Sequence, residues 1–559
     1  MKYFVSLLAI AAIAACNSTN HAPSPEAIAS INLKKGDMVL CSPPGTTFGD
    51  VDFLVSASGD VKKEFNNAVA MLHSFEYDES EKAFARIIDK DPSCAMAYWG
   101  AAMSNYHPLW EPPSQAELKK GAKAIEVAQS IEGKTERESA YINAMAAFYK
   151  DWEKTDHKTR SRAYEKAMAD VYAKYPSDDE AAIFYALALN STADPKDKTY
   201  AQQRKAGEML TKIHSRKPDH PGLIHYIIHN YDNPVLAPMA LEAARKYASL
   251  APASAHAQHM PSHIFTRLGL WDESITSNMA SISSAQCYAQ GAKIDGNYDE
   301  ELHGMDYLMY AYLQRGSNDL AKKQWDNLRS IKKVSAQNFK VAYAYATIPA
   351  RYTMENRQWD EAAKLDFYPA DLPWEKFPWQ RAIIHNARLM GMVHTNDIAG
   401  ATKELDKLKL IYNDLVEKKE DYKASQVAVQ MKGGEAWIEL KKGNNTKALE
   451  LMTQAADLED GTEKHPVTPG EVLPARELLG DMYMTLQQPA KALLAYEADL
   501  ERHPNRFNGL YGAGLAAEKT GDPQKAGMYY TKLSKSAPGT QRPELNTAGL
   551  FLKGLQASL

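Results

Sequence analysis

The sequence contains few cysteines and lacks the short motifs of several large enzyme classes. Its 559 residues include only four cysteines, none in a Cys-x-x-Cys spacing, which argues against a closed thiolate zinc site. No Gly-x-Ser-x-Gly elbow, no Gly-x-x-x-x-Gly-Lys loop and no His-Glu-x-x-His motif occurs. The common hydrolase and nucleotide-binding classes therefore lose their best support.

The sequence also lacks an excess of positive charge and, after its first residues, a long apolar run. The formal net charge is -5, with 24% charged and 45% hydrophobic residues. Without a basic stripe interleaved with aromatics, we expect no nucleic-acid partner. No later stretch of about eighteen apolar residues occurs, so we expect a mature part that is soluble apart from any anchor. At this length the chain is either several domains or a repeat array.

The first sixteen residues have the pattern of an export signal. Lys2 precedes an apolar run over residues 4–15, which is too short to span a membrane permanently. Ile13-Ala14-Ala15-Cys16 resembles the bacterial lipobox, in which the cysteine is lipidated before cleavage. The resemblance implies a lipid anchor at Cys16 in the cell envelope, and Asn17 favours the outer membrane facing the periplasm. The alternative is an accidental cysteine in an ordinary signal sequence.

Export changes how the other cysteines are interpreted. The periplasm is oxidising, so two thiols that lie close in space would form a disulfide. Cys41, Cys94 and Cys287 remain after Cys16 is acylated. At most one disulfide can form among them, and the sequence leaves its pairing open.

The remainder of the chain has one dominant pattern. Residues 17–60 are rich in Ser, Pro, Ala and Gly and are expected to form a tether and an entry segment. From residue 61 onward almost all of the sequence has helical periodicity. We divide it into N-terminal repeats over residues 61–330, with a histidine-rich groove, and C-terminal repeats over residues 331–559.

A period near 34 residues identifies the repeat. Such a period is typical of a helix, a turn and a second helix. The repeated positions are Leu479, Gly480, Tyr483, Ala492, Tyr496 and Pro504 in one unit, and Gly514, Ala526, Tyr530 and Pro538 in the next. In these residues the sequence resembles the tetratricopeptide repeat (TPR) family of bacterial lipoproteins, and the resemblance implies an all-α, right-handed superhelical solenoid with a concave groove.

Histidines recur with the same period. The pair at positions 225 and 229 stands one helical turn apart, and the pair at 259 and 263 follows 34 residues later. In the TPR family the equivalent places face the groove, so the resemblance implies a histidine row along its wall. Imidazoles with a carboxylate suit zinc, iron or copper. The predicted ligands for one or two transition-metal ions are His225, His229, His256, His259, His263, His303 and Asp306.

Two features work against this hypothesis. A buried histidine is often only a hydrogen-bonded core residue. Pro261 also lies inside the expected helix, where it would remove a backbone hydrogen bond unless it is the first helical residue. In that case His256 and His259 would lie on a lead-in segment. Asp232 is a further possible ligand or base.

A second set of residues is assigned to the ligand groove. His73 and His107 are also 34 residues apart. Packing is an alternative role for both. For Arg506, the alternative role is to hydrogen-bond the end of a helix. The predicted groove residues are His73, Trp99, His107, Tyr310 and Arg506.

The sequence therefore predicts a lipid-anchored solenoid that faces the periplasm. Its groove would bind a protein, a peptide or a small-molecule ligand, beside a histidine-lined site for a transition metal (Zn, Fe or Cu). The alternative is a metal-dependent enzyme that uses the same His and Asp cluster. The sequence indicates neither a reaction nor whether the chain is catalytic.

Overall fold

The computed structural model describes residues 22–41, 48–110, 112–252, 254–539 and 542–557. Helices dominate these residues, and the strands β1 (Asn297–Tyr298) and β2 (Val334–Ser335) form one short parallel pair. Cys16, the predicted lipidation site, and the predicted signal peptide lie outside the described residues. Among the helices in the described ranges, none is long and apolar enough to cross a membrane.

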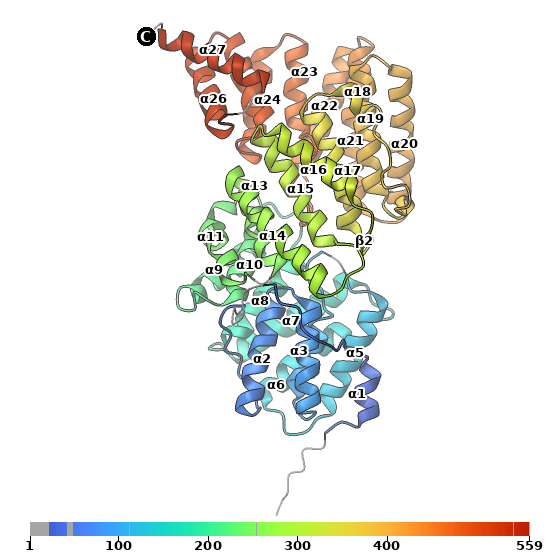
Figure 1. Cartoon of the computed structure of the whole chain (residues 1–559), viewed down its shortest axis with the longest axis vertical. Coiled ribbons are helices and arrows are strands. Elements are labelled where there is room, and N and C mark those ends of the chain that lie inside the picture. Colours follow the sequence, from blue (N-terminus) through green and yellow to red (C-terminus); the bar gives the residue numbers. More distant parts are fainter. Residues whose placement is uncertain (1–21, 42–47, 111, 253, 540–541, 558–559) are drawn as a thin grey trace, which may run out of the picture.

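The first half of the chain forms a stack of helix pairs, drawn in blue to green in the lower part of Figure 1. Its elements are α1 (Pro25–Ile31), α2 (Gly59–His73), α3 (Tyr77–Lys90), α4 (Ala95–Met103), α5 (Gln115–Ser130), α6 (Glu136–Tyr149), α7 (His157–Lys174), α8 (Asp179–Thr192), α9 (Ala201–His214), α10 (Pro221–Tyr231), η1 (Ala237–Ala240), α11 (Leu241–Leu250), α12 (Ala255–His259), α13 (Pro261–Leu268) and α14 (Trp271–Gly291).

The second half continues the stack towards the C-terminal end, with α27 at the top of Figure 1. Its elements are α15 (Asp299–Gln314), α16 (Asn318–Ser330), α17 (Phe339–Glu355), α18 (Trp359–Ala362), η2 (Trp374–Lys376), α19 (Pro378–His394), α20 (Ile398–Glu417), α21 (Asp421–Lys441), α22 (Asn445–Asp460), α23 (Ala475–Thr485), α24 (Pro489–Arg502), α25 (Phe507–Lys519), α26 (Pro523–Ser536) and α27 (Pro543–Ala557).

Successive helices pack in antiparallel pairs, and each pair packs on the next. Small residues meet large rings where the helices cross. A Cβ atom added to Gly480 would lie 2.6 Å from the Tyr496 ring, and one added to Gly514 would lie 2.5 Å from the Tyr530 ring. Only glycine permits this approach, because core packing leaves no free volume. The predicted all-α solenoid of TPR-like helix pairs is confirmed.

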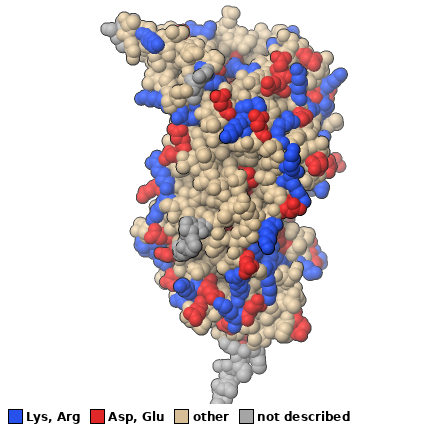
Figure 2. Space-filling view, in the orientation of Figure 1, with Lys and Arg blue, Asp and Glu red and all other residues tan. Residues whose placement is uncertain are grey.

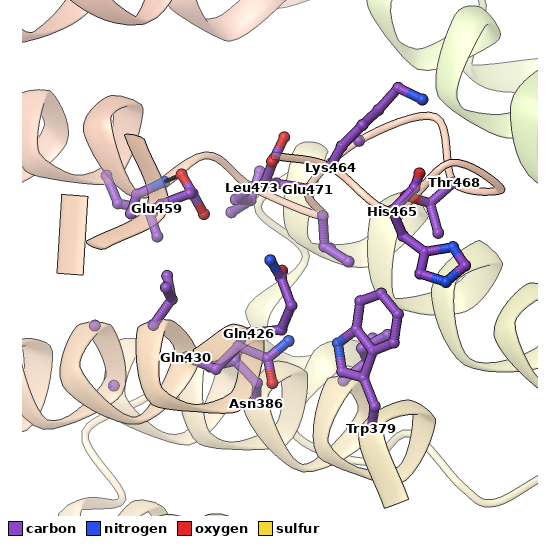
Figure 3. Close-up of a pocket in the computed structure, with 18 of the residues that line it drawn as sticks. Trp379, Asn386, Gln426, Gln430, Glu459, Lys464, His465, Thr468, Glu471 and Leu473 are labelled. Atoms are coloured by element: carbon purple, nitrogen blue, oxygen red, sulfur yellow. Dashed lines mark hydrogen bonds between the residues drawn. The ribbon is translucent and has the colours of Figure 1, made fainter. Parts of the chain in front are cut away.

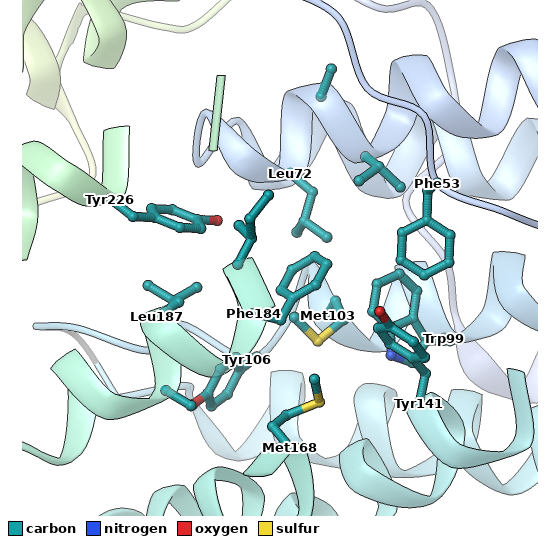
Figure 4. Packing of buried hydrophobic residues seen from close by; sticks show 14 of the residues in the cluster. Phe53, Leu72, Trp99, Met103, Tyr106, Tyr141, Met168, Phe184, Leu187 and Tyr226 are labelled. Atoms are coloured by element: carbon teal, nitrogen blue, oxygen red, sulfur yellow. The ribbon is translucent and has the colours of Figure 1, made fainter. Parts of the chain in front are cut away.

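The hydrophobic core follows the stack in successive sections. The first runs from Ile31 to Phe265 and contains the aromatic group in Figure 4, in which the Phe53 ring lies 5.3 Å from that of Trp99. The second runs from Leu302 to Ala495. The boundary expected between residues 330 and 331 falls inside this second section. The helices that carry the histidines lie around the junction of the two sections.

Part of the expected tether is packed against the repeats. The short helix α1 lies on α5, and the backbone N–H of Val39 donates to Glu79 at 2.9 Å. Cys41 then forms a disulfide with Cys287 on α14. Cys94 is a buried free thiol. The one disulfide that the sequence allowed therefore joins the entry segment to the middle of the molecule.

Candidate metal centre

Six of the predicted histidines lie on neighbouring helices at the middle of the stack. His225 and His229 are on α10, His256 and His259 are on α12, His263 is on α13 and His303 is on α15. They divide into two adjacent groups of three, in which the possible ligand atoms lie within 4.8 Å of one another. We call the groups triad A (His225, His229 and His256) and triad B (His259, His263 and His303).

Pro261 is accommodated as the first residue of α13. Met260, which joins α12 to α13, keeps helical backbone angles of φ -51° and ψ -38°. The helical path therefore continues past the proline, although the hydrogen-bond ladder is interrupted. His256, His259 and His263 consequently stay on one face, because their spacing of three and four residues matches the helical repeat.

In triad A the Nε2 atoms of all three histidines converge. Nε2 of His225 lies 3.0 Å from that of His229 and 3.1 Å from that of His256. On its other side, Nδ1 of His225 donates to the backbone carbonyl of His73 at 2.6 Å. Burial lowers the pKa of His225 to about 3. The ring is therefore neutral, with its proton on Nδ1 and a bare Nε2 that faces its two neighbours.

In triad B the outer partners also determine the tautomers. Nδ1 of His263 lies 2.9 Å from Oδ2 of Asp232. Nδ1 of His259 lies 2.7 Å from Oδ1 of Asn278, whose Nδ2 donates to the Ser274 carbonyl. The oxygens of Asp232 and Asn278 carry no proton, so each Nδ1 is the hydrogen-bond donor. Burial lowers the pKa of both histidines, which keeps the rings neutral.

The inward nitrogens of His259 and His263 consequently have no proton between them. The two Nε2 atoms lie 3.0 Å apart. The hydroxyl of Tyr307 is 3.3 Å from Nε2 of His263, but it donates to the Thr468 carbonyl at 3.0 Å. Two lone pairs at this distance repel each other unless a cation lies between them. Two imidazole nitrogens bound to one tetrahedral zinc ion at about 2.0–2.1 Å lie roughly 3.3–3.4 Å apart, a few tenths of an ångström more than this spacing.

Asp306, the seventh predicted ligand, is directed elsewhere. Its Oδ1 accepts from Thr347 at 2.6 Å and from Nε of Arg351 at 3.4 Å. Burial raises its pKa. The structure does not bring Asp306 into either triad. Asp232, which the sequence suggested only as a possible ligand, instead holds a triad histidine through Nδ1.

A third group of buried titratable residues contains His73, Glu180 and His220. Nε2 of His73 lies 3.0 Å from one oxygen of Glu180, and Nε2 of His220 lies 2.9 Å from the other. Nδ1 of His73 accepts from the Tyr226 hydroxyl at 3.0 Å. Each inward nitrogen of this group therefore faces an acceptor, unlike those of triad B. We assign the group to the support of α10, because the His73 carbonyl also orients His225.

Several of these partners have no local signal in the sequence. Glu180 is one acidic residue among many, and Asn278 lies in a polar stretch of α14. Both contact histidines on other helices. Only the recurrence of histidines at 34-residue steps was visible in the sequence.

Most of the predicted groove residues lie in the interior. His73, Trp99 and Arg506 are fully buried, and Tyr310 is 2% exposed. Trp99 fills the core between aromatic rings, so it cannot contact a ligand in a groove. His107 lines a cavity of about 180 Å³, and its Nε2 lies 3.3 Å from Glu117.

Arg506 does bind carboxylates, but they belong to the same chain. Its guanidinium contacts Glu477 at 3.0 Å, Glu355 at 2.7 Å and the hydroxyl of Tyr310 at 3.0 Å. These ion pairs raise the pKa of Arg506 despite its burial. The guanidinium therefore joins α15, α17 and α23 inside the second half of the molecule.

Two neighbouring cavities adjoin the triads. The smaller, of about 20 Å³, is lined by His229, His256, His263 and His303, together with Trp110 and Lys340. The larger, of about 180 Å³, shares His256, Trp110 and Lys340 with it. Space for a ligand therefore exists beside triad A, whose His229 and His256 are only partly buried.

A loop from the second half packs against the triads and lines the smaller cavity. Residues 461–474 connect α22 to α23 and carry Lys464, whose Nζ binds Asp232 at 2.8 Å. Pro466 and Val467 line the smaller cavity. Figure 3 shows the same loop from within a further cavity of about 50 Å³, where His465 and Thr468 lie above Trp379. The centre is therefore enclosed by residues from both halves of the chain.

No family model and no curated protein matches the chain. Among solved structures it is similar to the Naa15/Naa10 complex bound to HypK, with 10% identity over 89% of this chain and 92% of that chain and a TM-score of 0.25. It is also similar to the APC/C hetero-tetramer Cut9–Hcn1, with 12% identity, coverage of 89% and 90%, and a TM-score of 0.31. For the human IFIT1 dimer with m7Gppp-AAAA, identity is 10%, coverage 83% and 94%, and the TM-score 0.32. At these values the similarity carries no inference about function.

Proposed function

We propose that this protein is an envelope-anchored helical solenoid that binds transition-metal ions in triads A and B and presents them to a ligand. The observation that carries the proposal is the pair of unprotonated nitrogens of His259 and His263, which face each other at 3.0 Å. The outer nitrogens of metal-binding histidines ordinarily donate to a carboxylate, a carbonyl or an amide oxygen. Asp232 and Asn278 fill this role in triad B.

The ligand chemistry favours a transition metal over calcium or magnesium. All six donors are neutral imidazoles, which suit zinc, iron or copper. Three protein ligands leave at least one coordination position for water or a ligand. In triad A this position would face the cavities, because His229 and His256 border them.

The direct test is the metal content of the mature chain, purified without a histidine tag from the residue after Cys16. Plasma mass spectrometry should find close to two transition-metal ions per chain after reconstitution. The double variant His259→Ala/His263→Ala should lose one ion, and His225→Ala/His229→Ala should lose the other. His214→Ala, which changes a histidine outside both triads, should lose none. Background metal in the reconstituted parent chain would refute the proposal.

The proposed location rests on the lipobox and on the disulfide. A Cys41–Cys287 disulfide is expected in an oxidising compartment. Mass spectrometry of the N-terminal peptide should detect a diacylglyceryl group on Cys16, and Cys16→Ser should release the protein from the outer-membrane fraction. An unmodified Cys16 in the membrane-bound protein would contradict this part of the proposal.

A protein partner is proposed for the outer face of α14. In Figure 2 a broad uncharged area occupies the middle of the molecule, and residues 274–291 of α14 contain no charged residue. Met279 on this helix is 55% exposed. Met279→Glu should weaken recovery of a partner that copurifies from envelope extracts. Leu410→Glu, at an exposed site on α20, is the control and should leave it unchanged.

A metal-dependent enzyme is the second candidate function. The observation that favours it is the cavity beside His256, which Glu76 also lines. Burial raises the pKa of Glu76 to about 7, which suits a general acid or base near neutral pH. The test is an activity that requires metal. If Glu76→Gln abolishes this activity and keeps its metal content, the enzyme is supported over a binding protein.

A further inference from the structure

The cavity of about 180 Å³ next to His256 has walls of a particular chemical kind. Five aromatic side chains line it, from Phe75 and Tyr77 on the first repeat to Tyr288 and Tyr298 near α15, with Trp110 at the border of the smaller cavity. The rings of Phe75 and Tyr77 stack at 5.2 Å. Those of Tyr288 and Tyr298 lie 5.1 Å apart. The volume is enough for about six water molecules at roughly 30 Å³ each, so only a small ligand fits.

The charged groups in and behind these walls do not balance. Lys340 binds both Asp299, at 2.7 Å, and Glu300, at 2.6 Å. Lys82 binds Glu79 at 2.6 Å, which also accepts from the Tyr288 hydroxyl.

The outer edge has a further ion pair, between Lys34 and Asp78. Among the described residues, no lysine or arginine forms an ion pair with Glu76. Five acidic side chains, with Glu76 among them, thus share three lysines. The cavity therefore has a negative potential, which attracts a cation.

We propose that this cavity binds a small organic ammonium ion, with the cationic group between the Glu76 carboxylate and the surrounding aromatic rings. Aromatic faces attract ammonium groups through their quadrupole, and a desolvated carboxylate adds a direct ion pair. The rest of the ligand points to His256. The orientation of the ligand towards a metal at His256 rests on the proposed metal binding by triad A. The preference of the cavity for a positively charged ligand does not.

The test compares two molecules of the same shape. Choline and its uncharged isostere 3,3-dimethylbutan-1-ol are titrated by calorimetry into the mature chain, both metal-free and zinc-loaded. We expect choline to bind at least tenfold more tightly than the isostere, because only choline gains from the charge. Equal affinities, binding of glucose in place of choline, or no binding of choline to either form would overturn the inference.

Two variants localise the binding. Glu76→Gln keeps the shape of the side chain and should weaken choline binding about tenfold, and Trp110→Leu should weaken it severalfold through loss of an aromatic face. Glu136→Gln, which changes an exposed carboxylate on α6, is the matched control and should leave it unchanged. Circular dichroism checks that each variant is folded. Unchanged affinity in folded Glu76→Gln would place choline elsewhere and refute the proposed site.

The experiments distinguish a failure of the metal proposal from a failure of the cavity proposal. Choline binding to a chain with background metal content would leave the cavity assigned and the metal centre refuted. Metal bound at two ions per chain with no choline binding would refute the cavity assignment alone. Tighter choline binding to the zinc-loaded chain than to the metal-free chain would support the orientation towards His256.

Discussion

Lys464 binds Asp232 at 2.8 Å although 232 residues separate them in the sequence. Arg267 binds the other oxygen of Asp232 at 2.9 Å, so two cations meet one buried carboxylate. Burial favours the neutral acid, but Lys464 and Arg267 hold the pKa of Asp232 well below its usual range. The carboxylate is therefore ionised and can accept the Nδ1 proton of His263, which connects the loop over residues 461–474 to triad B.

This relationship predicts that Asp232→Asn weakens metal binding in triad B selectively. Loss of an outer-sphere carboxylate typically lowers metal affinity tenfold to a hundredfold. Competition with a chelator should show this loss for one ion and leave the ion of triad A unchanged. Asp179→Asn, which removes a carboxylate at a distant ion pair, is the control. Equal weakening of both ions would contradict the division into two triads.

Replacement of Arg506 distinguishes a structural role from ligand binding. Arg506→Met would leave Glu355 and Glu477 buried without their common cation. Breaking a buried pair in this way usually costs about 3–5 kcal/mol. Urea unfolding should show this loss, whereas Arg216→Met, at an exposed ion pair, should cost less than about 1 kcal/mol. A folded Arg506→Met protein of parental stability would be evidence for the groove role that the sequence suggested.

His503 should make stability depend on pH. Burial opposes its charge, but Asp499 at 2.9 Å and Glu471 at 3.1 Å outweigh burial and raise its pKa well above 6.5. A raised folded-state pKa contributes stability that is complete below pH 6.5 and is lost as the pH rises through the folded-state pKa. Between pH 6.5 and 7.5 the parent should therefore lose about 1 kcal/mol relative to His503→Gln.

The measurement is urea unfolding of both proteins across this range. The window lies below the pH at which Lys464 titrates, because burial lowers its pKa only to about 8. Groups common to both proteins cancel in the difference between them. An energy difference that is constant with pH would mean that His503 is neutral in the folded state.

The disulfide predicts a thiol count. In the denatured mature chain, a thiol-reactive dye should label only Cys94 before reduction and should label Cys41, Cys94 and Cys287 afterwards. Reduction should lower the free energy of unfolding by about 2–5 kcal/mol, as removal of a native disulfide usually does. Cys94→Ser is the control and should remove one label from each count. Three labels before reduction would contradict the pairing.

The sequence predicted those features that depend on residues near each other in the repeat. Gly480 and Tyr496, which belong to one unit, were recognised from their spacing and meet in the structure. The same period placed the 225–229 and 259–263 pairs on adjacent helices. Both predictions follow from helical geometry, since equivalent positions in stacked units must be neighbours.

The predictions that failed concern how deeply a side chain is buried and which residues distant in the sequence it contacts. Trp99 and Arg506 have the residue types of a binding groove, but burial depends on the packing of several units and not on the spacing within one. Asp306 has the right spacing from His303, yet Arg351 and Thr347 on α17 compete for its carboxylate. No local pattern identifies such a competitor, because it lies about forty residues away in the sequence.

The bond between Cys41 and Cys287 also has a mechanical meaning. If Cys16 is held in a lipid bilayer, a force on the protein enters through the N-terminal segment and passes at the disulfide into α14. Part of the chain between the anchor and this bond is held on the repeats, because α1 packs on α5 and the backbone N–H of Val39 donates to Glu79 on α3. The disulfide is the covalent route into α14 that bypasses α2 to α13, so tension would reach the first repeats and their histidines only through these non-covalent contacts.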